Sequence, residues 1–308
     1  MKKIILIIIL INHSLFAELI SPIEDKLDIN LSKALLGKRL FFEKRLSSDN
    51  TISCANCHII SEGGDDNKRF SIGVNNKKGS VNSPTVLNSR YNFVQFWDGR
   101  AKDLKEQAMG PIHNPVEMNS HSNEVVQKLK KDASYVKSFK TVFNSEITFD
   151  FVLDAIVEFE KALITPNSKF DQYLKGDKTA LNDDEKEGFE LFKSYGCISC
   201  HNGVNLGGNL FQQMGILKIM HYEKNKYLGR YNVTKNEEDR YFYKVPTLRN
   251  IEHTAPYLHS GTISTLKETI EIMLEYQVGI KPKAENVEKI LSFLKTLTGE
   301  QPKIMDMN

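Results

Sequence analysis

Four cysteines carry the first chemical signal in this chain of 308 residues. They fall into two runs, and in each run two residues separate the cysteines and a histidine follows directly. The runs contain Cys54, Cys57 and His58 in the first half of the chain, and Cys197, Cys200 and His201 in the second. Two thiols at this spacing can add to the two vinyl groups of one haem, and the adjacent histidine then ligates the iron. The spacing predicts two covalently bound c-type haems.

Three other uses of paired cysteines fit this pattern less well. Two disulfides are usual for four cysteines in an exported protein, but they require no histidine after each pair. A structural zinc site needs a second pair of ligands at short range. A redox-active C-x-x-C motif also needs no histidine, and we would not expect it twice.

Predicted helices surround both motifs. Apolar residues at helical spacing predict a helix over 31–45 before the first motif and another over 151–163. Asn182, with Glu185 as its reciprocal partner, caps a predicted helix that runs into Cys197. Further helices are predicted over 123–140, from the Thr265 cap onward and over 284–297. Long loops are predicted over 61–100 and from the glycines at 207 and 208 to Arg240. Few segments alternate with period two, so we expect a mainly α fold.

The order of these elements indicates a divergent internal duplication. Each half contains a helix, then a C-x-x-C-H run, then a loop region and further helices. Pro166 and its neighbours end the helix that closes the first half. We therefore expect two cytochrome c-like domains, 18–166 and 167–308, which each bind one haem and pack around an interface between them.

The first 17 residues have the pattern of a secretory signal peptide. Two lysines precede an apolar run from Ile4 to Ile11, which is too short to cross a bilayer, and a small residue, Ala17, follows. No later stretch is long and apolar enough to span a membrane. Without residues 1–17 the chain has equal numbers of basic and acidic residues, so no basic field favours nucleic acid as a partner.

The second axial ligand of each iron decides between an electron carrier and an enzyme. A methionine opposite the histidine closes the iron and raises its reduction potential, whereas an iron without a sixth protein ligand can bind a small oxidant. Met214, Met220 and Met273 all follow the second motif. The first two have little chain with which to reach over a haem, and Met273 lies on a predicted helix where it can equally be a core residue.

Several ordered motifs give the chain a specific resemblance. They are Asn82-Ser83-Pro84-Thr85, Gln95 to Arg100, Glu106-Gln107-Ala108, Gly110-Pro111, Val116 to Asn119, Cys197 to Gly208, Leu248-Arg249-Asn250, Thr254 to Tyr257 and His259-Ser260-Gly261. Through them the chain resembles the bacterial dihaem cytochrome c peroxidases, which are related to MauG, over nearly all of its length after the leader.

The resemblance implies that hydrogen peroxide is reduced to water in the periplasm with two electrons from a small donor protein. The haem held by Cys54, Cys57 and His58 would be the peroxidatic one. The haem held by Cys197 and Cys200, with His201 and Met273 as axial ligands, would accept electrons from the donor. Relatives are usually homodimers with a calcium ion between the two haem domains.

The resemblance also implies roles for single residues. Glu117 matches the catalytic acid–base group, and a carboxylate suits the proton transfer that splits an O–O bond. Gln107 and Phe96 match other positions that line the peroxidatic site. Trp97, the only tryptophan, would pass electrons between the haems. Without these motifs we would interpret Glu117 as a solvated loop charge and Trp97 as a core aromatic.

A calcium site and a histidine at the second haem complete the implied set. Asn82 and the backbone carbonyls of Thr254 and Pro256 would bind calcium, and water would fill the other positions. So little ligand charge predicts a weak site. His259 would lie near the edge of the C-terminal haem.

Val74 departs from the pattern of the resemblance. Relatives commonly carry a histidine there, which caps the peroxidatic iron until the other haem is reduced. Because valine cannot ligate iron, we expect an open peroxidatic haem without reductive activation. The alternative is a substitute ligand, His113 or Met118.

Two other functions remain open from the sequence. A dihaem electron carrier without turnover would have two closed irons and no need for Glu117 or Gln107. A MauG-like enzyme would use peroxide to oxidise a partner protein, but that relative has a tyrosine where Met273 stands, so the methionine argues against it.

Overall fold

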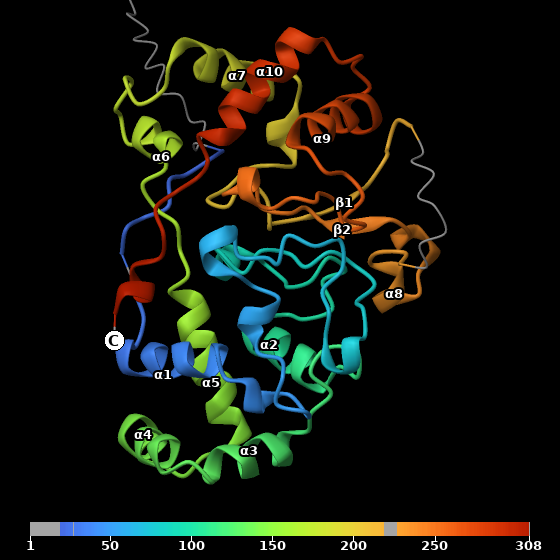
Figure 1. Cartoon of the computed structure of the whole chain (residues 1–308). Helices are drawn as coiled ribbons and strands as arrows, with labels where there is room; N and C mark the ends of the chain where they lie inside the picture. The colour runs from blue at the N-terminus through green and yellow to red at the C-terminus, as the bar shows by residue number, and fades with distance from the viewer. Residues whose placement is uncertain (1–18, 27, 219–226, 308) are drawn as a thin grey trace, which may run out of the picture.

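The computed structural model describes residues 19–26, 28–218 and 227–307 and confirms a mainly helical fold. In Figure 1 the first half of the chain, blue to green, forms one end of the molecule, and the second half, yellow to red, forms the other. The predicted leader, Met220 and His221 lie outside the described residues. No helix in the described ranges combines the length and the apolar character that a bilayer crossing requires.

The helices of the first half pack around one central helix, α5. Apolar residues of α5 repeat at helical spacing and are buried, and Thr148 caps its first turn. The helices of this half are α1 (Leu31–Phe41), α2 (Leu104–His113), α3 (Ser122–Lys130), α4 (Ala133–Phe143) and α5 (Phe149–Lys161). As predicted, most of the segment between α1 and α2 is loop, interrupted by short 3₁₀ turns.

The single helix predicted over 123–140 is wrong, because the structure has α3 and α4 there. Asp132 stands between them in an extended conformation, and its side chain accepts a hydrogen bond from the backbone N–H of Ser134. An aspartate that caps the next helix in this way cannot continue the previous one.

The second half repeats this arrangement and adds a small strand pair. Asn182 and Glu185 form the predicted capping box, and Thr265 caps α9 as predicted. The strands β1 and β2 are antiparallel. Both β1 and the short helix α8 lie in the segment for which the sequence predicts a loop. The elements are α6 (Lys169–Leu174), α7 (Asp183–Ser194), β1 (Phe211–Gln213), α8 (Tyr231–Thr234), β2 (Phe242–Lys244), α9 (Leu266–Ile272), a π-helical turn η9 (Met273–Val278) and α10 (Ala284–Lys295).

A close crossing of two helices recurs in both halves. A methyl group on Gly37 of α1 would overlap the carbonyl oxygen of Ala155 in α5, and one on Gly188 of α7 would overlap that of Lys289 in α10. Four residues after each glycine, Phe41 and Phe192 pack against a phenylalanine of the partner helix. The same two rings lie 6.4 Å from His58 and His201. The crossing therefore supports the motif histidine in the same way twice, in accord with a duplication.

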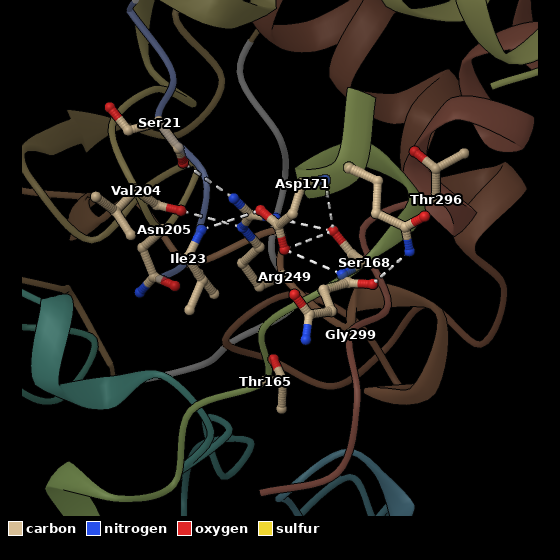
Figure 2. Close-up of polar contacts among 12 residues, drawn as sticks. Ser21, Ile23, Thr165, Ser168, Asp171, Val204, Asn205, Arg249, Thr296 and Gly299 are labelled. Atoms are coloured by element: carbon tan, nitrogen blue, oxygen red, sulfur yellow. Dashed lines mark hydrogen bonds and ion pairs between the residues drawn. The ribbon is translucent and has the colours of Figure 1, made fainter. Parts of the chain in front are cut away.

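Each end of the chain packs against the opposite half. Figure 2 shows Arg249 between Asp171 and the segment that contains Ser21 and Ile23. The Arg249–Asp171 ion pair measures 2.8 Å and is fully buried. Arg249 also donates to the Ser21 carbonyl oxygen (3.1 Å), and Asp171 accepts from the Ile23 N–H (3.0 Å).

The C-terminal segment makes the reciprocal contact. Lys38 of α1 donates to the carbonyl oxygens of Ile304, Met305 and Met307 at 2.6–3.2 Å. In Figure 1 the C-terminus correspondingly lies beside α1. Ile304 is fully buried in a cluster with Ala34, Phe41 and Phe159, so the last residues complete the core of the first half. The boundary at Pro166 stays a prediction.

Candidate functional site

The two C-x-x-C-H runs fold into the same short turn. Each begins a 3₁₀ turn, Cys54–Asn56 and Cys197–Ser199. In each, the N–H of the histidine donates to the carbonyl oxygen of the first cysteine at 3.0 Å. This turn places two thiols and one imidazole side by side. No disulfide joins any of the four cysteines.

Three of the four thiols have a raised pKa, which does not suit redox exchange. Burial raises the pKa of Cys57 and of Cys197 to about 11, and it raises the pKa of Cys54 further. A redox-active C-x-x-C motif instead needs a lowered pKa and an accessible thiolate. In the described part of the chain no three metal-binding His, Cys, Asp or Glu side chains gather, so the zinc interpretation has no ligand set there.

Both motif histidines are oriented by a backbone carbonyl. His58 Nδ1 lies 3.0 Å from the Gly64 oxygen, and His201 Nδ1 lies 3.3 Å from the Leu206 oxygen. A hydrogen bond at Nδ1 fixes the ring and leaves Nε2 for a metal. Burial lowers the pKa of His58, and it lowers that of His201 to about 4. Both rings are therefore neutral and suited to ligate iron.

A cavity of about 500 Å³ opens beside the second motif. Cys197, Cys200, His201 and Met273 all line it, and its apolar wall includes Phe192, Ile270, Leu274, Ile290 and Leu294. Met273 begins the π-helical turn η9, a local irregularity that is common at functional sites. Two thiols, an imidazole, a thioether and an apolar wall fit a c-type haem. Met214 lines the same cavity, so it is still an alternative sixth ligand.

Glu117, the expected acid–base residue, lies close to the first haem motif. Its carboxylate is half-buried and accepts a hydrogen bond from the Asn114 amide at 2.6 Å. Burial raises the pKa of Glu117, and the nearby Arg100 opposes this shift. The Glu117 charge also acts on the Cys57 thiol. Glu117 is thus a partly desolvated carboxylate close to the first haem motif.

Phe96 and Gln107 are connected to Glu117 only indirectly, through Arg100 and α2. The Arg100 guanidinium lies 3.5 Å from the centre of the Phe96 ring, and that ring approaches Gly110 of α2. Gln107 lies one turn before Gly110, so the two share a face of α2. Phe96 also lines the cavity beside the second motif, whereas Gln107 and Glu117 do not. Phe96 therefore lies between the two halves of the site.

Val74 is packed directly against the Glu117 segment. Its side chain is fully buried, and its backbone N–H donates to the Glu117 carbonyl oxygen at 2.8 Å. The two substitute ligands are both engaged elsewhere. His113 lies 3.1 Å from Ser122 Oγ and stacks on Phe149, and Met118 is buried in the core of the first half.

Trp97 lies in a chain of contacts that joins the two halves. Its indole N–H donates to the Asn82 carbonyl oxygen (2.8 Å), and the Asn82 N–H donates to the His259 carbonyl oxygen (2.9 Å). The Trp97 and His259 rings are 6.2 Å apart, edge to face, and Tyr243 stacks on His259 at 4.1 Å. Asn82, Trp97, Tyr243 and His259 all line the cavity beside the second motif. Sequence reasoning missed Tyr243, because its position is set by the unpredicted strand β2.

The expected calcium ligands also line this cavity. Asn82 donates its amide N–H to the Lys68 carbonyl oxygen (2.9 Å), which leaves its side-chain oxygen for a cation. Among the described residues nothing donates to the carbonyl oxygens of Thr254 and Pro256. Such uncharged oxygens fit calcium.

Asp65 is a further residue of this cavity that the sequence analysis missed. It is 1% exposed, and one carboxylate oxygen has no partner among the described residues. Burial, with the neighbouring Asp66 charge, raises its pKa to about 7. In the sequence, only the neighbouring Asp66 could have drawn attention to Asp65.

Comparisons with known proteins agree with one another. A family model described as di-haem cytochrome c peroxidase matches residues 31–179. The cytochrome c551 peroxidase of Nitrosomonas europaea is 52% identical over 288 residues, which cover 92% of this chain and 85% of the relative. That of Pseudomonas aeruginosa is 44% identical over 278 residues, with 87% and 79% covered. Among solved structures, a MauG-like protein associated with microbial copper homeostasis superposes with a TM-score of 0.82 at 28% identity, covering 94% of this chain and 96% of that one.

Proposed function

Since this chain belongs to the di-haem cytochrome c peroxidase family, we propose that it reduces hydrogen peroxide to two molecules of water. Two protons and two electrons are consumed, and the electrons come from a small donor protein such as a monohaem cytochrome c. The observation that carries this proposal is the repeated C-x-x-C-H turn, with an oriented neutral histidine in each copy. We place the reaction in the periplasm.

The two turns have different roles. Cys54, Cys57 and His58 would hold the peroxidatic haem, and Cys197, Cys200, His201 and Met273 would hold the haem that receives electrons. When bound, the haems supply the iron at which peroxide is cleaved and the sites at which electrons are held. Trp97 and His259 connect the halves, and their edge-to-face contact supports the role of Trp97 in electron passage.

Glu117 moves the proton in this scheme. Its ionised carboxylate accepts a proton from the near oxygen of peroxide and returns it to the leaving oxygen. Partial desolvation supports this role, because it raises the pKa of Glu117 and so makes the carboxylate a better proton acceptor than an exposed glutamate. Asn114 holds the carboxylate, and Gln107 offers a neutral amide that can hold peroxide by hydrogen bonds.

Val74 leaves the peroxidatic site without the usual histidine cap. The contacts of His113 with Ser122 and Phe149, and the burial of Met118 in the core of the first half, support the absence of a substitute ligand. The fully oxidised enzyme is then active without prior reduction of the second haem.

The decisive experiment compares peroxide reduction by the fully oxidised protein and by protein reduced only at the C-terminal haem. We expect equal steady-state rates without a lag, and a high-spin EPR signal from the diferric protein. In Val74→His the lag should appear and be abolished by pre-reduction, whereas Lys78→His, an exposed change in the same loop, should behave as wild type. A long lag or an entirely low-spin N-terminal haem in the wild type would contradict the open site.

Two further parts of the proposal concern assembly. Asn82, Thr254 and Pro256 bind calcium between the halves, and two chains form a homodimer. Size-exclusion chromatography with and without a calcium chelator tests both, since it reports the dimer and its dependence on the ion.

Similarity to a MauG-like structure favours oxidation of a partner protein as a second candidate function. Met273, which lines the cavity beside the second motif, argues against oxidation of a partner protein. A peroxide assay in which a reduced small cytochrome is oxidised catalytically separates the two.

A further inference from the structure

Lys244 is a buried cation that the proposed chemistry does not use. It ends β2, where its backbone N–H donates to the Trp97 carbonyl oxygen at 2.8 Å. Only 5% of the residue is exposed. It lines the cavity that Cys197, His201 and Met273 also line, so this cation belongs to the pocket of the C-terminal haem.

No group in the described part of the chain neutralises this cation. Its Nζ atom has no hydrogen-bond or ion-pair partner there, and burial alone lowers the pKa of Lys244 to about 8. Arg249 shows the contrast, because that buried cation is paired with Asp171 at 2.8 Å. A buried cation is costly unless an anion is close to it.

Among the described residues, the acidic side chains near the cavity do not supply that anion. Asp65 lines the cavity, but the charges that act on it are those of Asp66 and Glu62 and not that of Lys244. Asp98 is held by Arg100 at 3.0 Å. The missing anion must therefore arrive with whatever occupies the cavity.

A haem brings such anions, since each carries two propionate groups. We propose that Lys244 binds a propionate of the C-terminal haem as an ammonium–carboxylate pair. This inference rests on the proposed function, in which Cys197 and Cys200 hold that haem in the same cavity.

The backbone contact with Trp97 then ties the propionate edge of the haem to the residue that joins the two halves. A cation at the propionate also favours the reduced haem, which carries one positive charge less than the oxidised haem.

The test is a redox titration of the holoprotein, with each haem followed by its absorption. In Lys244→Met, which keeps the length of the side chain but removes the charge, the midpoint potential of the C-terminal haem should fall. Lys244→Arg should restore it, because the guanidinium can pair with a carboxylate. Lys281→Met, which removes an exposed lysine, should leave it unchanged. An unchanged potential in Lys244→Met, with both haems attached, would overturn the inference.

A comparison of the wild type with Lys244→Arg covers the case in which Lys244→Met does not fold. Redox-difference infrared spectra, recorded with haem labelled with ¹³C at the propionates, should show a labelled carboxylate band that shifts in Lys244→Arg. A band that is the same in both proteins would refute the pair.

The inference and the proposed function fail in different ways. Fewer than two haems per chain in a pyridine haemochrome assay would defeat the function itself. Two haems and normal peroxide turnover, together with an unmoved potential in Lys244→Met, would defeat only the pair.

Discussion

Glu117 is the side chain on which the proposed proton transfer depends. Glu117→Gln keeps the size and the Asn114 contact but cannot take up a proton, so we expect peroxide turnover to fall about 10²- to 10⁴-fold. Haem content and the absorption spectrum should not change. The exposed Glu146→Gln is the matched control. Turnover within a factor of two of wild type would show that another group moves the proton.

The pH profile tests the same residue. Because burial raises the pKa of Glu117, the ionised form that accepts the proton is lost at a higher pH than for an exposed glutamate. The acid side of the profile of kcat should therefore lie above the ordinary range of a glutamate, and Glu117→Gln should remove it. An acid side unchanged in the variant would assign it to a different group.

At this scale the sequence was informative where chemistry demands a fixed spacing. The C-x-x-C-H runs predicted the thiols and histidines that the structure brings together in each turn. Lys244 and Asp65 could not be found in this way, because their importance comes from burial without a partner. The surroundings that bury these two side chains come from segments distant in sequence, such as Trp97 beside Lys244, and only the fold brings them together.

Among the elements, the glycine crossings of α1 with α5 and of α7 with α10 give a direct test of packing. Gly188→Ala should lower the free energy of unfolding by about 1–3 kcal/mol, because the added methyl group overlaps the Lys289 backbone. Urea unfolding measures this. Gly79→Ala is the control, since its methyl group meets only ordinary contacts at 3.7 Å and beyond. Equal losses in both variants would contradict the packing argument.

The elements were predicted best where a cap marks the start of a helix. Asn182 with Glu185, and Thr265 with Glu268, indicated the starts of α7 and α9 correctly. The break between α3 and α4 was missed because apolar spacing continues through Asp132, and only its capping bond ends the periodicity. The strand β1 was missed because three residues are too few for an alternating pattern.

At the scale of the whole molecule, the buried Arg249–Asp171 pair links α6, the N-terminal segment and the loop before β1. Asp171→Asn leaves a buried guanidinium without its counter-charge, so the free energy of unfolding should fall by about 3–5 kcal/mol. Denaturant unfolding of the holoprotein measures this. Asp150→Asn, which weakens only an exposed pair with Lys105, should change little. A small loss in Asp171→Asn would mean that the network of Figure 2 contributes little stability.

Each end of the chain packs against the opposite half, and this has a consequence for biogenesis. A chain that is synthesised and translocated from its N-terminus delivers Ile304, a core residue of the first half, only when nearly all other residues have emerged. Until then α1 lacks the carbonyl groups that Lys38 binds, and the first C-x-x-C-H turn belongs to an unfinished core. We therefore expect haem attachment to the first turn to precede completion of the core around it.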